Sequence, residues 1–229
     1  KTLLIDLDPQ SNATTGVEEL LINTDKNIYD ALIRGTPTKE VITKTQLSHL
    51  NLITSTSDLV GAEVELVSIM AREHQLEKVL KPILKKYDYI LIDCPPSLGL
   101  LTLNALTCCD TVIIPIQCEY YALEGLSSLL RTIEQVRESV NPTLEMYGIL
   151  RTMFDPRINL SNEVSMQLIE HFDRKVFRTV VPRNIRLAEA PSFGLPILLH
   201  DRSSRGAIAY LALAGEVLRR EDERMAEAV

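Results

Sequence analysis

Short apolar runs and longer amphipathic stretches alternate along the chain, and this alternation predicts strands and helices in turn. The first run, residues 3–5, leads into two aspartates and stops at Pro9, as expected of a buried parallel strand. Strands that alternate with helices predict right-handed βαβ units on a mostly parallel sheet. Further strands are predicted at residues 49–54, 87–93, 111–116, 146–152 and 176–181. Helices are predicted at residues 28–33, 59–71, 76–86, 123–140, 160–172 and 206–220, with Pro82 bending or interrupting the third.

Composition limits the classes of protein to which the chain can belong. Its 229 residues are 45% hydrophobic and 24% charged, enough for one core, and no linker or internal repeat divides them. We therefore expect a single domain over residues 1–229. No run of 18 apolar residues and no basic-then-apolar leader occurs, so neither a membrane span nor secretion is expected. The four cysteines lack C-x-x-C spacing, which favours buried free thiols in a reducing cytoplasm over a metal site.

Carboxylates follow two of the predicted strands. Asp6 and Asp8 come after the first strand, and Asp93 ends the strand YILID, which has the form of a Walker B strand. Ligands of open α/β sheets bind beyond the carboxyl ends of the strands, and a carboxylate there can hold Mg²⁺ through water. For Asp6 and Asp8, a turn at the end of the strand that Asp8 merely caps is the more ordinary explanation. The phosphate loop that accompanies Walker B is absent, because none of the nine glycines is followed by lysine.

Charge is divided unevenly along the chain. The net charge is −7, but residues 151–205 carry 9 Lys or Arg against 6 Asp or Glu. This basic segment could be an electrostatic footprint for phosphates, since such binding depends on local charge. An ordinary solvated face has the same composition, so charge alone does not decide between the two.

Four segments resemble the motifs of one family, the ParA/Soj partitioning ATPases with a deviant Walker A motif. They are DLDPQSNATTG at residues 6–16, IDCPPSLGLLTLNA at 92–105, QCEYYALEG at 117–125 and VPRNIRLAEAPSFG at 181–194. The resemblance implies an α/β fold of the P-loop NTPase type, a doubly wound, mostly parallel sheet with helices on both faces. In that family a strand, the lysine-rich P-loop and a helix precede DLDPQ. A first βα unit of about 30 residues is therefore expected to be missing from this sequence, which would be N-terminally truncated.

The resemblance implies an ATP hydrolase that uses ATP and Mg²⁺. Asp8 corresponds to the catalytic carboxylate that orients the attacking water, and Asp93 to the Walker B aspartate that holds the metal. Asp6 supports the metal site indirectly. Without the P-loop unit, the sequence alone is expected to be inactive and to expose two strand edges. The adenine contacts of the family map to Met153, Pro182 and Asn184.

The resemblance also implies a switch that acts on DNA. The family forms a homodimer with ATP, binds DNA without sequence preference, and segregates plasmid or chromosome DNA with a ParB-type activator. Two arginines that bind DNA match Arg157 and Arg186, and both lie in the basic segment. Such a protein is expected to be cytoplasmic, associated with the nucleoid and not with a membrane.

Three alternatives stay open at this point. A MinD-like membrane-associated ATPase would carry a basic amphipathic C-terminal helix, whereas residues 216–229 are acidic and lack Trp and Phe. A P-loop-less, non-enzymatic interaction module is the second, although such a remnant has no need to keep Asp8 and Asp93. A redox carrier like the nitrogenase iron protein would ligate a cluster through cysteines, and Cys94 and Cys118 lack the glycine-rich surroundings expected there.

Overall fold

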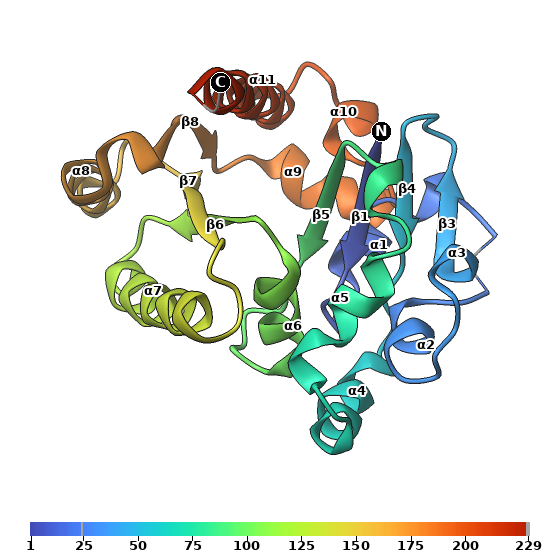
Figure 1. Cartoon of the computed structure of the whole chain (residues 1–229). Helices are drawn as coiled ribbons and strands as arrows, with labels where there is room; N and C mark the ends of the chain where they lie inside the picture. Colours follow the sequence, from blue (N-terminus) through green and yellow to red (C-terminus); the bar gives the residue numbers. More distant parts are fainter. Residues whose placement is uncertain (24, 228–229) are drawn as a thin grey trace. The chain divides into compact units, whose positions relative to one another are not determined.

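The computed structural model describes residues 1–23 and 25–227, in which strands and helices alternate as predicted (Figure 1). Contacts between residues divide the chain into two compact units. Unit 1 contains Lys1–Asp110, Thr132–Leu144 and Pro191–Leu195. Unit 2 contains Thr111–Arg131, Glu145–Ala190 and the residues from Pro196 onward. The single domain expected over residues 1–229 stays a prediction beside these two units.

Unit 1 is built on a five-stranded sheet in the order β2-β3-β4-β1-β5. Its strands are β1 (Thr2–Asp6), β2 (Leu21–Ile22), β3 (Ile42–Thr45), β4 (Leu50–Ile53) and β5 (Tyr89–Asp93). β1 lies between β4 and β5 and is parallel to both, whereas β3 is antiparallel to β2 and β4. Leu3 and Ile5 of β1 are fully buried, which explains the continuous apolar run of this central strand.

Short helices complete unit 1 and cover the apolar side chains of β1. Leu59, Leu76 and Leu101, one from each of three helices, are fully buried in the same core cluster as Leu3 and Ile5. The helices are α1 (Asn12–Thr15), α2 (Ile28–Leu32), α3 (Thr38–Val41), α4 (Leu59–Glu65), α5 (Gln75–Leu80) and α6 (Leu100–Cys108).

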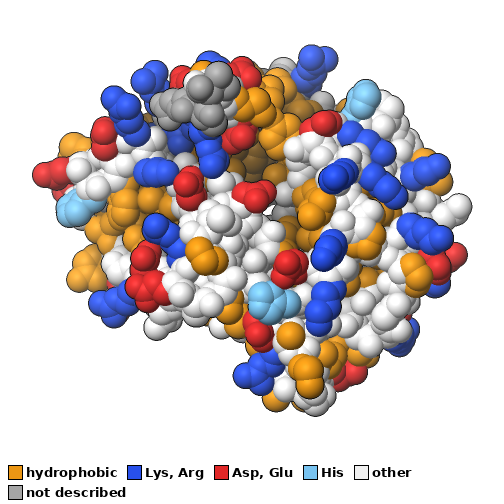
Figure 2. All heavy atoms as spheres, viewed as in Figure 1, with side chains coloured by type: hydrophobic (Ala, Val, Ile, Leu, Met, Phe, Trp, Pro, Cys, Tyr) orange, Lys and Arg blue, Asp and Glu red, His pale blue; other side chains and the backbone are white. Residues whose placement is uncertain are grey.

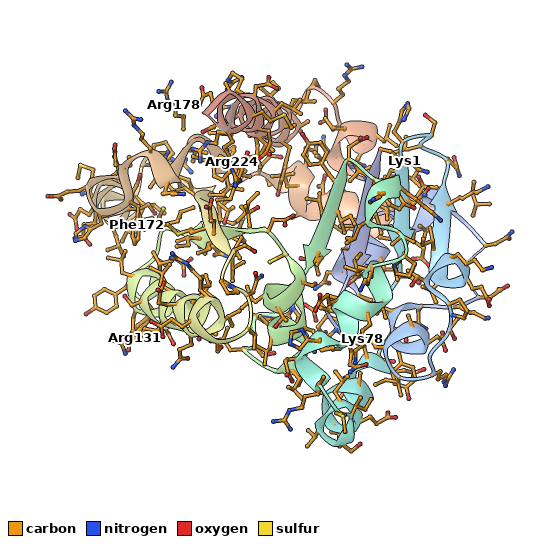
Figure 3. All side chains as sticks on the ribbon, in the orientation of Figure 1. Lys1, Lys78, Arg131, Phe172, Arg178 and Arg224 are labelled. Carbon is orange, nitrogen blue, oxygen red and sulfur yellow. The ribbon has the colours of Figure 1, made fainter. Side chains whose placement is uncertain are left out.

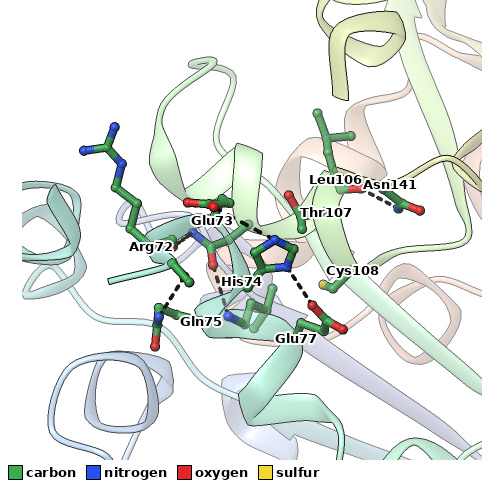
Figure 4. A network of polar contacts seen from close by, with 12 residues as sticks. Arg72, Glu73, His74, Gln75, Glu77, Leu106, Thr107, Cys108 and Asn141 are labelled. Carbon is green, nitrogen blue, oxygen red and sulfur yellow. Dashed lines mark hydrogen bonds and ion pairs between the residues drawn. The ribbon is translucent and has the colours of Figure 1, made fainter. Parts of the chain in front are cut away.

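Buried amide side chains join the helices of unit 1. Asn104 of α6 is fully buried, accepts a hydrogen bond from the N–H of Leu76 at 3.0 Å and donates to the carbonyl of Arg72 at 2.8 Å. Asn141 donates to the carbonyl of Leu106 at 2.9 Å, close to the end of α6 (Figure 4). These bonds satisfy polar groups that would otherwise be buried without partners.

Unit 2 is built on a three-stranded parallel sheet in the order β6-β7-β8. Glu216 of the last helix accepts hydrogen bonds from the N–H groups of Arg178 and Thr179, both at 2.8 Å, and so fastens that helix to β8. No helix among the described residues has the length and apolar character needed to cross a membrane. The elements are β6 (Thr111–Gln117), β7 (Glu145–Phe154), β8 (Val176–Pro182), α8 (Asn159–Phe172), α9 (Ile185–Glu189), α10 (Ile197–His200) and α11 (Arg205–Glu227), while α7 (Ala122–Ser139) begins in unit 2 and ends in unit 1.

Several elements differ from the predictions for local reasons. The helix expected at 59–71 is α4 followed by a 3-10 turn, η2 (Leu66–Ser68), and Ala71 beyond it has a left-handed backbone with φ 51°. The helix expected at 76–86 is split around Pro82 into α5 and η4 (Leu84–Lys86), because proline lacks the N–H of the helical hydrogen bond. The last helix extends to Glu227, since its Ala, Glu and Arg residues favour helix. The sequence patterns did not predict α6, β2 or β3.

The edge strands in the sheets of the described chain are β2 and β5 in unit 1 and β6 and β8 in unit 2. Apolar side chains are exposed on two of them, Leu91 of β5 at 52% and Ile113 of β6 at 38%. The free N–H and C=O groups of such an edge can accept a further strand.

Candidate functional site

Two of the predicted carboxylates lie side by side at one end of the sheet of unit 1. Asp6 closes β1, Asp93 closes β5, and the parallel register pairs these two residues directly. The N–H of Leu7 donates to the carbonyl of Asp93 at 2.8 Å and continues the pairing beyond Asp6 toward Asp8. Parallel pairing thus brings groups that are far apart in the sequence to the sheet edge where ligands of such folds bind. Asp6, Asp8 and Asp93 are referred to below as the carboxylate site.

Asp6 is fully buried, and its carboxylate is held by its own chain. Oδ2 accepts hydrogen bonds from the backbone N–H and the hydroxyl of Thr14, both at 2.7 Å. Oδ1 accepts from the N–H of Asp8 at 3.1 Å. A buried charge needs such donors, and these three tie α1 to the end of β1. The arrangement suits the indirect, supporting role expected of Asp6.

Asp8 lies in a turn whose hydrogen bonds use one of its two carboxylate oxygens. Oδ1 accepts from the N–H of Gln10 at 2.9 Å, so the turn that the sequence alone favoured is present. The carbonyl of Asp8 accepts the hydroxyl of Ser55 at 2.7 Å, and the N–H of Ser55 donates to the Thr14 hydroxyl at 3.0 Å. Asp8 is 9% exposed, and its Oδ2 accepts no hydrogen bond from the described residues. One fixed and one available oxygen suit a group that orients a water molecule.

Asp93 is exposed at the end of β5, unlike the other two carboxylates. Desolvation by the atoms packed around its carboxyl is the largest cause that raises the pKa of Asp93 above its ordinary value, and the charges of Asp6 and Asp8 raise it further. A cation at this edge would relieve that repulsion, and oxygen ligands are those that Mg²⁺ prefers. Among the described residues, no group of three or more His, Cys, Asp or Glu is arranged to ligate a metal directly. The exposed carboxylate of Asp93 fits a magnesium ion, because its oxygens are ligands of the kind that Mg²⁺ prefers.

The chain leaves Asp93 through a turn, residues 94–99, that leads into α6. Burial is the largest cause that raises the pKa of the Cys94 thiol to about 12. Gly99 precedes α6, and a Cβ at this position would collide with the carboxylate of Glu63 from α4. The hydroxyl of Thr102 donates to the carbonyl of Ser97 at 2.6 Å and closes the turn.

The residues expected to contact adenine lie at the carboxyl end of the sheet of unit 2. Met153 is the penultimate residue of β7, and Pro182 ends the parallel neighbour β8 opposite Phe154. Asn184 follows as the N-cap of α9, and its side-chain oxygen accepts from the N–H of Leu187 at 3.2 Å. Met153 has a left-handed backbone with φ 51° and is 42% exposed. A non-glycine residue held in this conformation is strained, which makes it a candidate functional position.

Arg157, the first residue expected to bind DNA, projects from the surface of unit 2. Its side chain is 87% exposed, and its Nη2 and Nε donate to Asp155 at 2.6 and 2.9 Å. This two-point contact is the largest cause that lowers the pKa of Asp155 to about 2. The guanidinium is therefore partly neutralised by its own chain while it stays accessible to solvent.

Arg186, the second residue expected to bind DNA, is held in a similar way in α9. Its Nη1 lies 2.8 Å from Glu189 and its Nε 3.5 Å from Asp201, with 56% of the side chain exposed. Arg178 of β8 is also exposed and points away from the ribbon in Figure 3. The two arginines expected to bind DNA follow the carboxyl ends of neighbouring strands, and each has a local carboxylate partner.

Thr14 and Ser55 hold Asp6 and Asp8 through hydrogen bonds, and the sequence analysis did not select either residue. Thr14 stands beside Thr15, which is exposed, and Ser55 lies in the hydroxyl-rich run TSTS at residues 54–57. The usable signal was the position of that run directly after a strand parallel to β1. Such a run reaches the same edge of the sheet as Asp6.

Comparison with known proteins identifies the family. A family model described as an AAA domain matches residues 1–146. The chromosome partitioning protein ParA of Myxococcus xanthus is 51% identical over 221 residues, which cover 96% of this chain and 78% of the relative. The sporulation initiation inhibitor protein Soj of Bacillus subtilis is 49% identical over 217 residues, which cover 95% and 86%. The chain belongs to the ParA/Soj family of chromosome-partitioning ATPases.

Solved structures share the fold of this ParA/Soj protein. Cobyrinic acid a,c-diamide synthase from Mycobacterium smegmatis with bound ADP and magnesium has a TM-score of 0.80 at 32% identity, covering 97% of this chain and 83% of that one. A putative plasmid partition protein from Borrelia burgdorferi bound to AMPPNP has a TM-score of 0.79 at 25% identity, covering 96% and 87%. The cell division ATPase MinD from Pyrococcus furiosus, at 22% identity and a TM-score of 0.76, shares the fold alone. The predicted α/β class with a mostly parallel sheet is confirmed.

Proposed function

We propose that the intact ParA/Soj protein is a switch that binds and hydrolyses ATP. Its relatives are named as partitioning proteins and partitioning ATPases, and two of its structural neighbours contain a nucleotide or nucleotide analogue. The observation that carries the proposal is the carboxylate site. Asp6, Asp8 and Asp93 lie together at the carboxyl ends of β1 and β5. Hydrogen bonds through Thr14 and Ser55 hold Asp6 and Asp8 in fixed positions.

Each aspartate has a separate role in the proposed reaction. Mg²⁺, when bound, would supply positive charge that offsets the charge of the phosphates. Asp93 would hold the ion through water. Asp8 would accept a hydrogen bond from the attacking water with the oxygen that Gln10 does not occupy, and would so orient this water for attack. Asp6 would keep Asp8 in place, through its bond to the N–H of Asp8 and through Thr14 and Ser55, without touching the nucleotide.

We propose that Met153, Pro182 and Asn184 contact the adenine base. The capping bond occupies the side-chain oxygen of Asn184, which leaves its NH₂ group as a donor for a ring nitrogen of the base. Pro182 and the exposed side chain of Met153 add apolar contact area. The strained backbone of Met153 supports this assignment, because strain of this kind gathers at ligand sites.

We further propose that the protein forms a homodimer with ATP and binds DNA without sequence preference through Arg157 and Arg186. A ParB-type activator would stimulate hydrolysis and so segregate plasmid or chromosome DNA in the cytoplasm, on the nucleoid and not at a membrane. Both guanidiniums are exposed and belong to the basic segment at residues 151–205. Phosphate contacts of this kind carry no sequence information and weaken steeply with salt.

The substitution Asp8→Asn tests the catalytic assignment in the intact protein. We expect ATP hydrolysis to fall by about 10²–10⁴-fold, because asparagine cannot act as the base that orients the water. Binding of a fluorescent ATP analogue with Mg²⁺ should stay within about threefold of the parent, since Asp8 does not hold the phosphates. Asp110→Asn is the matched control, an exposed aspartate outside the site whose loss should leave both measurements unchanged.

Unchanged hydrolysis in Asp8→Asn would refute the catalytic role of this residue. Loss of nucleotide binding together with hydrolysis, in a protein that still unfolds cooperatively, would instead make Asp8 a binding residue. No binding of nucleotide by the intact parent protein would favour the non-enzymatic interaction module.

A further inference from the structure

A pocket of about 610 Å³ opens in unit 1 where the end of α2, the start of α3 and the segment from α5 to η4 meet. It is separate from the carboxylate site, and the proposed function assigns it no role. Its apolar lining includes Leu32, Ile69, Val79 and Ile83, and its lysines are Lys39, Lys78 and Lys86. We call it the lysine pocket, because three lysines and no acidic residue line it.

The walls of the lysine pocket are apolar and firmly held. Leu32 and Ile83 are buried, at 5% and 1% exposure, and form part of the core of unit 1. Ile69 and Val79 are half-buried and pack against that core. The hydroxyl of Thr38 donates to the carbonyl of Val79 and joins the α3 wall to the α5 wall. The pocket thus offers a preformed apolar surface of the kind that binds aliphatic side chains.

The rim of the pocket is positively charged although the protein as a whole is acidic. Lys39, Lys78 and Lys86 are all exposed, and Lys78 is labelled beside α5 in Figure 3. Figure 2 shows several Lys and Arg side chains on this face of unit 1. No ion pair among residues 1–23 and 25–227 involves any of the three rim lysines. Three cations therefore face the pocket in a chain whose net charge is −7.

The nearby acidic residues do not neutralise the rim, because each is held by another side chain. Arg34 donates to Asp30 at 2.7 Å, and Asp30 also completes the capping box of α2. Lys26 donates to Glu40 at 2.7 Å. Glu77 of α5, which directly precedes Lys78, lies 2.8 Å from Nδ1 of His74 (Figure 4).

We propose that the lysine pocket binds an acidic peptide segment of a partner protein that also carries aliphatic side chains. Carboxylates of the peptide would pair with the three rim lysines, and an aliphatic side chain would enter the space between Ile69 and Val79. The charge of the rim is complementary to such a segment, and the chain supplies no acidic residue of its own for it. Lysine suits carboxylates in varied positions, since its ammonium is a point charge on a flexible stem.

Nucleic acid fits the same pocket poorly. No aromatic residue lines it on which a base could stack, and no arginine is present to grip a phosphate with two hydrogen bonds. About half of the lining residues are apolar, and a sugar-phosphate backbone has no apolar groups that would pack against them. Binding of DNA at this place is accordingly the competing result that the experiment must separate.

The experiment uses two pairs of lysines from one short segment of the intact protein. Lys78 and Lys86 line the pocket, whereas Lys81 and Lys85 lie between them in the sequence, are also exposed and do not line it. The probe is a short fluorescein-labelled peptide of alternating Glu and Leu, and its affinity is measured by fluorescence anisotropy. We expect the double reversal Lys78→Glu with Lys86→Glu to weaken binding by about tenfold or more. The matched reversal Lys81→Glu with Lys85→Glu should change it by less than about twofold.

Two comparison probes complete the test. A peptide of Glu and Ser should bind the parent protein more weakly than the Glu and Leu peptide, because it lacks aliphatic side chains for the pocket. A labelled DNA duplex should bind the parent and both double variants with the same affinity. If both double reversals weaken binding of the acidic peptide equally, the effect reflects the overall charge of the protein, and the proposal is overturned. A loss of DNA binding confined to the Lys78 and Lys86 variant would also overturn it, because it would assign the pocket to nucleic acid.

Discussion

Asp6 of unit 1 and Arg157 of unit 2 hold their charges in opposite ways. Asp6 is fully buried and accepts three hydrogen bonds from its own chain. Arg157 keeps 87% of its side chain exposed and is held by one carboxylate, Asp155. A buried charge is stable only when its partners are in place, whereas an exposed ion pair adds little to stability and exchanges readily with solvent.

This difference indicates which properties of each region a substitution would alter. The carboxylate site depends on geometry, because Thr14 and Ser55 fix it through short hydrogen bonds. The proposed role of Arg157 and Arg186 depends on charge and access, because a DNA phosphate would have to displace their local carboxylates. Substitutions at the carboxylate site of unit 1 should therefore change protein stability and the rate of ATP hydrolysis. Substitutions of the arginines of unit 2 should change DNA affinity and its dependence on salt.

The largest effect is expected for Thr14→Val, which would break the network around Asp6. The substitution removes a donor to a fully buried carboxylate and an acceptor for the N–H of Ser55. We expect the free energy of unfolding in urea to fall by about 2–3 kcal/mol. Thr14→Ser keeps the hydroxyl and should recover most of the loss, while Thr15→Val at the exposed neighbour should stay within about 0.5 kcal/mol of the parent. A neutral Thr14→Val would show that the network does not stabilise unit 1.

The second effect concerns Arg186→Ala, which removes one exposed cation of unit 2. DNA affinity at low salt should fall by about tenfold and alike on unrelated sequences, because the contact is to phosphate. ATP-dependent dimerisation, followed by size-exclusion chromatography with light scattering, should be unchanged. Arg131→Ala removes the same charge from an exposed position of α7 outside the basic segment and serves as the control. Equal DNA affinity of Arg186→Ala and the parent at low salt would contradict the assignment.

A smaller effect is expected for Asp93→Asn in the absence of Mg²⁺. The pKa of Asp93 is raised in the folded state, so the folded protein binds this proton more tightly than the unfolded chain. Stability then declines as the pH rises above about 4, the ordinary range of an aspartate. Asp93→Asn should be more stable than the parent at neutral pH, by less than about 1 kcal/mol after screening by solvent, and equal to it below that range. Urea unfolding against pH measures the difference, which Mg²⁺ should reduce if it binds beside Asp93.

The smallest effect is expected for Glu189→Gln, which removes a carboxylate that holds Arg186 at 2.8 Å. A DNA phosphate would no longer compete with this charge, so DNA affinity should rise by about two- to threefold while stability stays nearly constant. Glu170→Gln in α8 makes the same change at another exposed position of unit 2. If both substitutions raise affinity equally, the gain reflects net charge and the specific pairing of Arg186 has no part in it.

The predictions from sequence succeeded where a pattern was local and strong. The apolar residues 3–5 correctly predicted β1, and the segment YILID correctly predicted β5 with Asp93 at its end. The predictions failed where the hydrophobic pattern was uniform or the element was short. α6 lies in LLTLNALTC, which is apolar on nearly all sides and so has no helical periodicity, and β2 has only two residues. The helix expected at 59–71 ends at Glu65 and its 3-10 continuation at Ser68, because Ile69 adopts an extended backbone that its residue type does not predict.

The sequence alone determined the family and the alternation of strands and helices, because the first follows from contiguous motifs and the second from the local period of apolar residues. Only the tertiary structure decided that Asp6 and Asp93 stand in register, and that Thr14 and Ser55 join Asp6 and Asp8 in one network. It also decided that Arg157 and Arg186 already have carboxylate partners and that three lysines share an apolar pocket. The register, the network and the pocket depend on parallel pairing and on contacts between distant segments, which no local pattern of residues encodes, whereas the partners Asp155 and Glu189 are near in sequence but were not selected by the motifs.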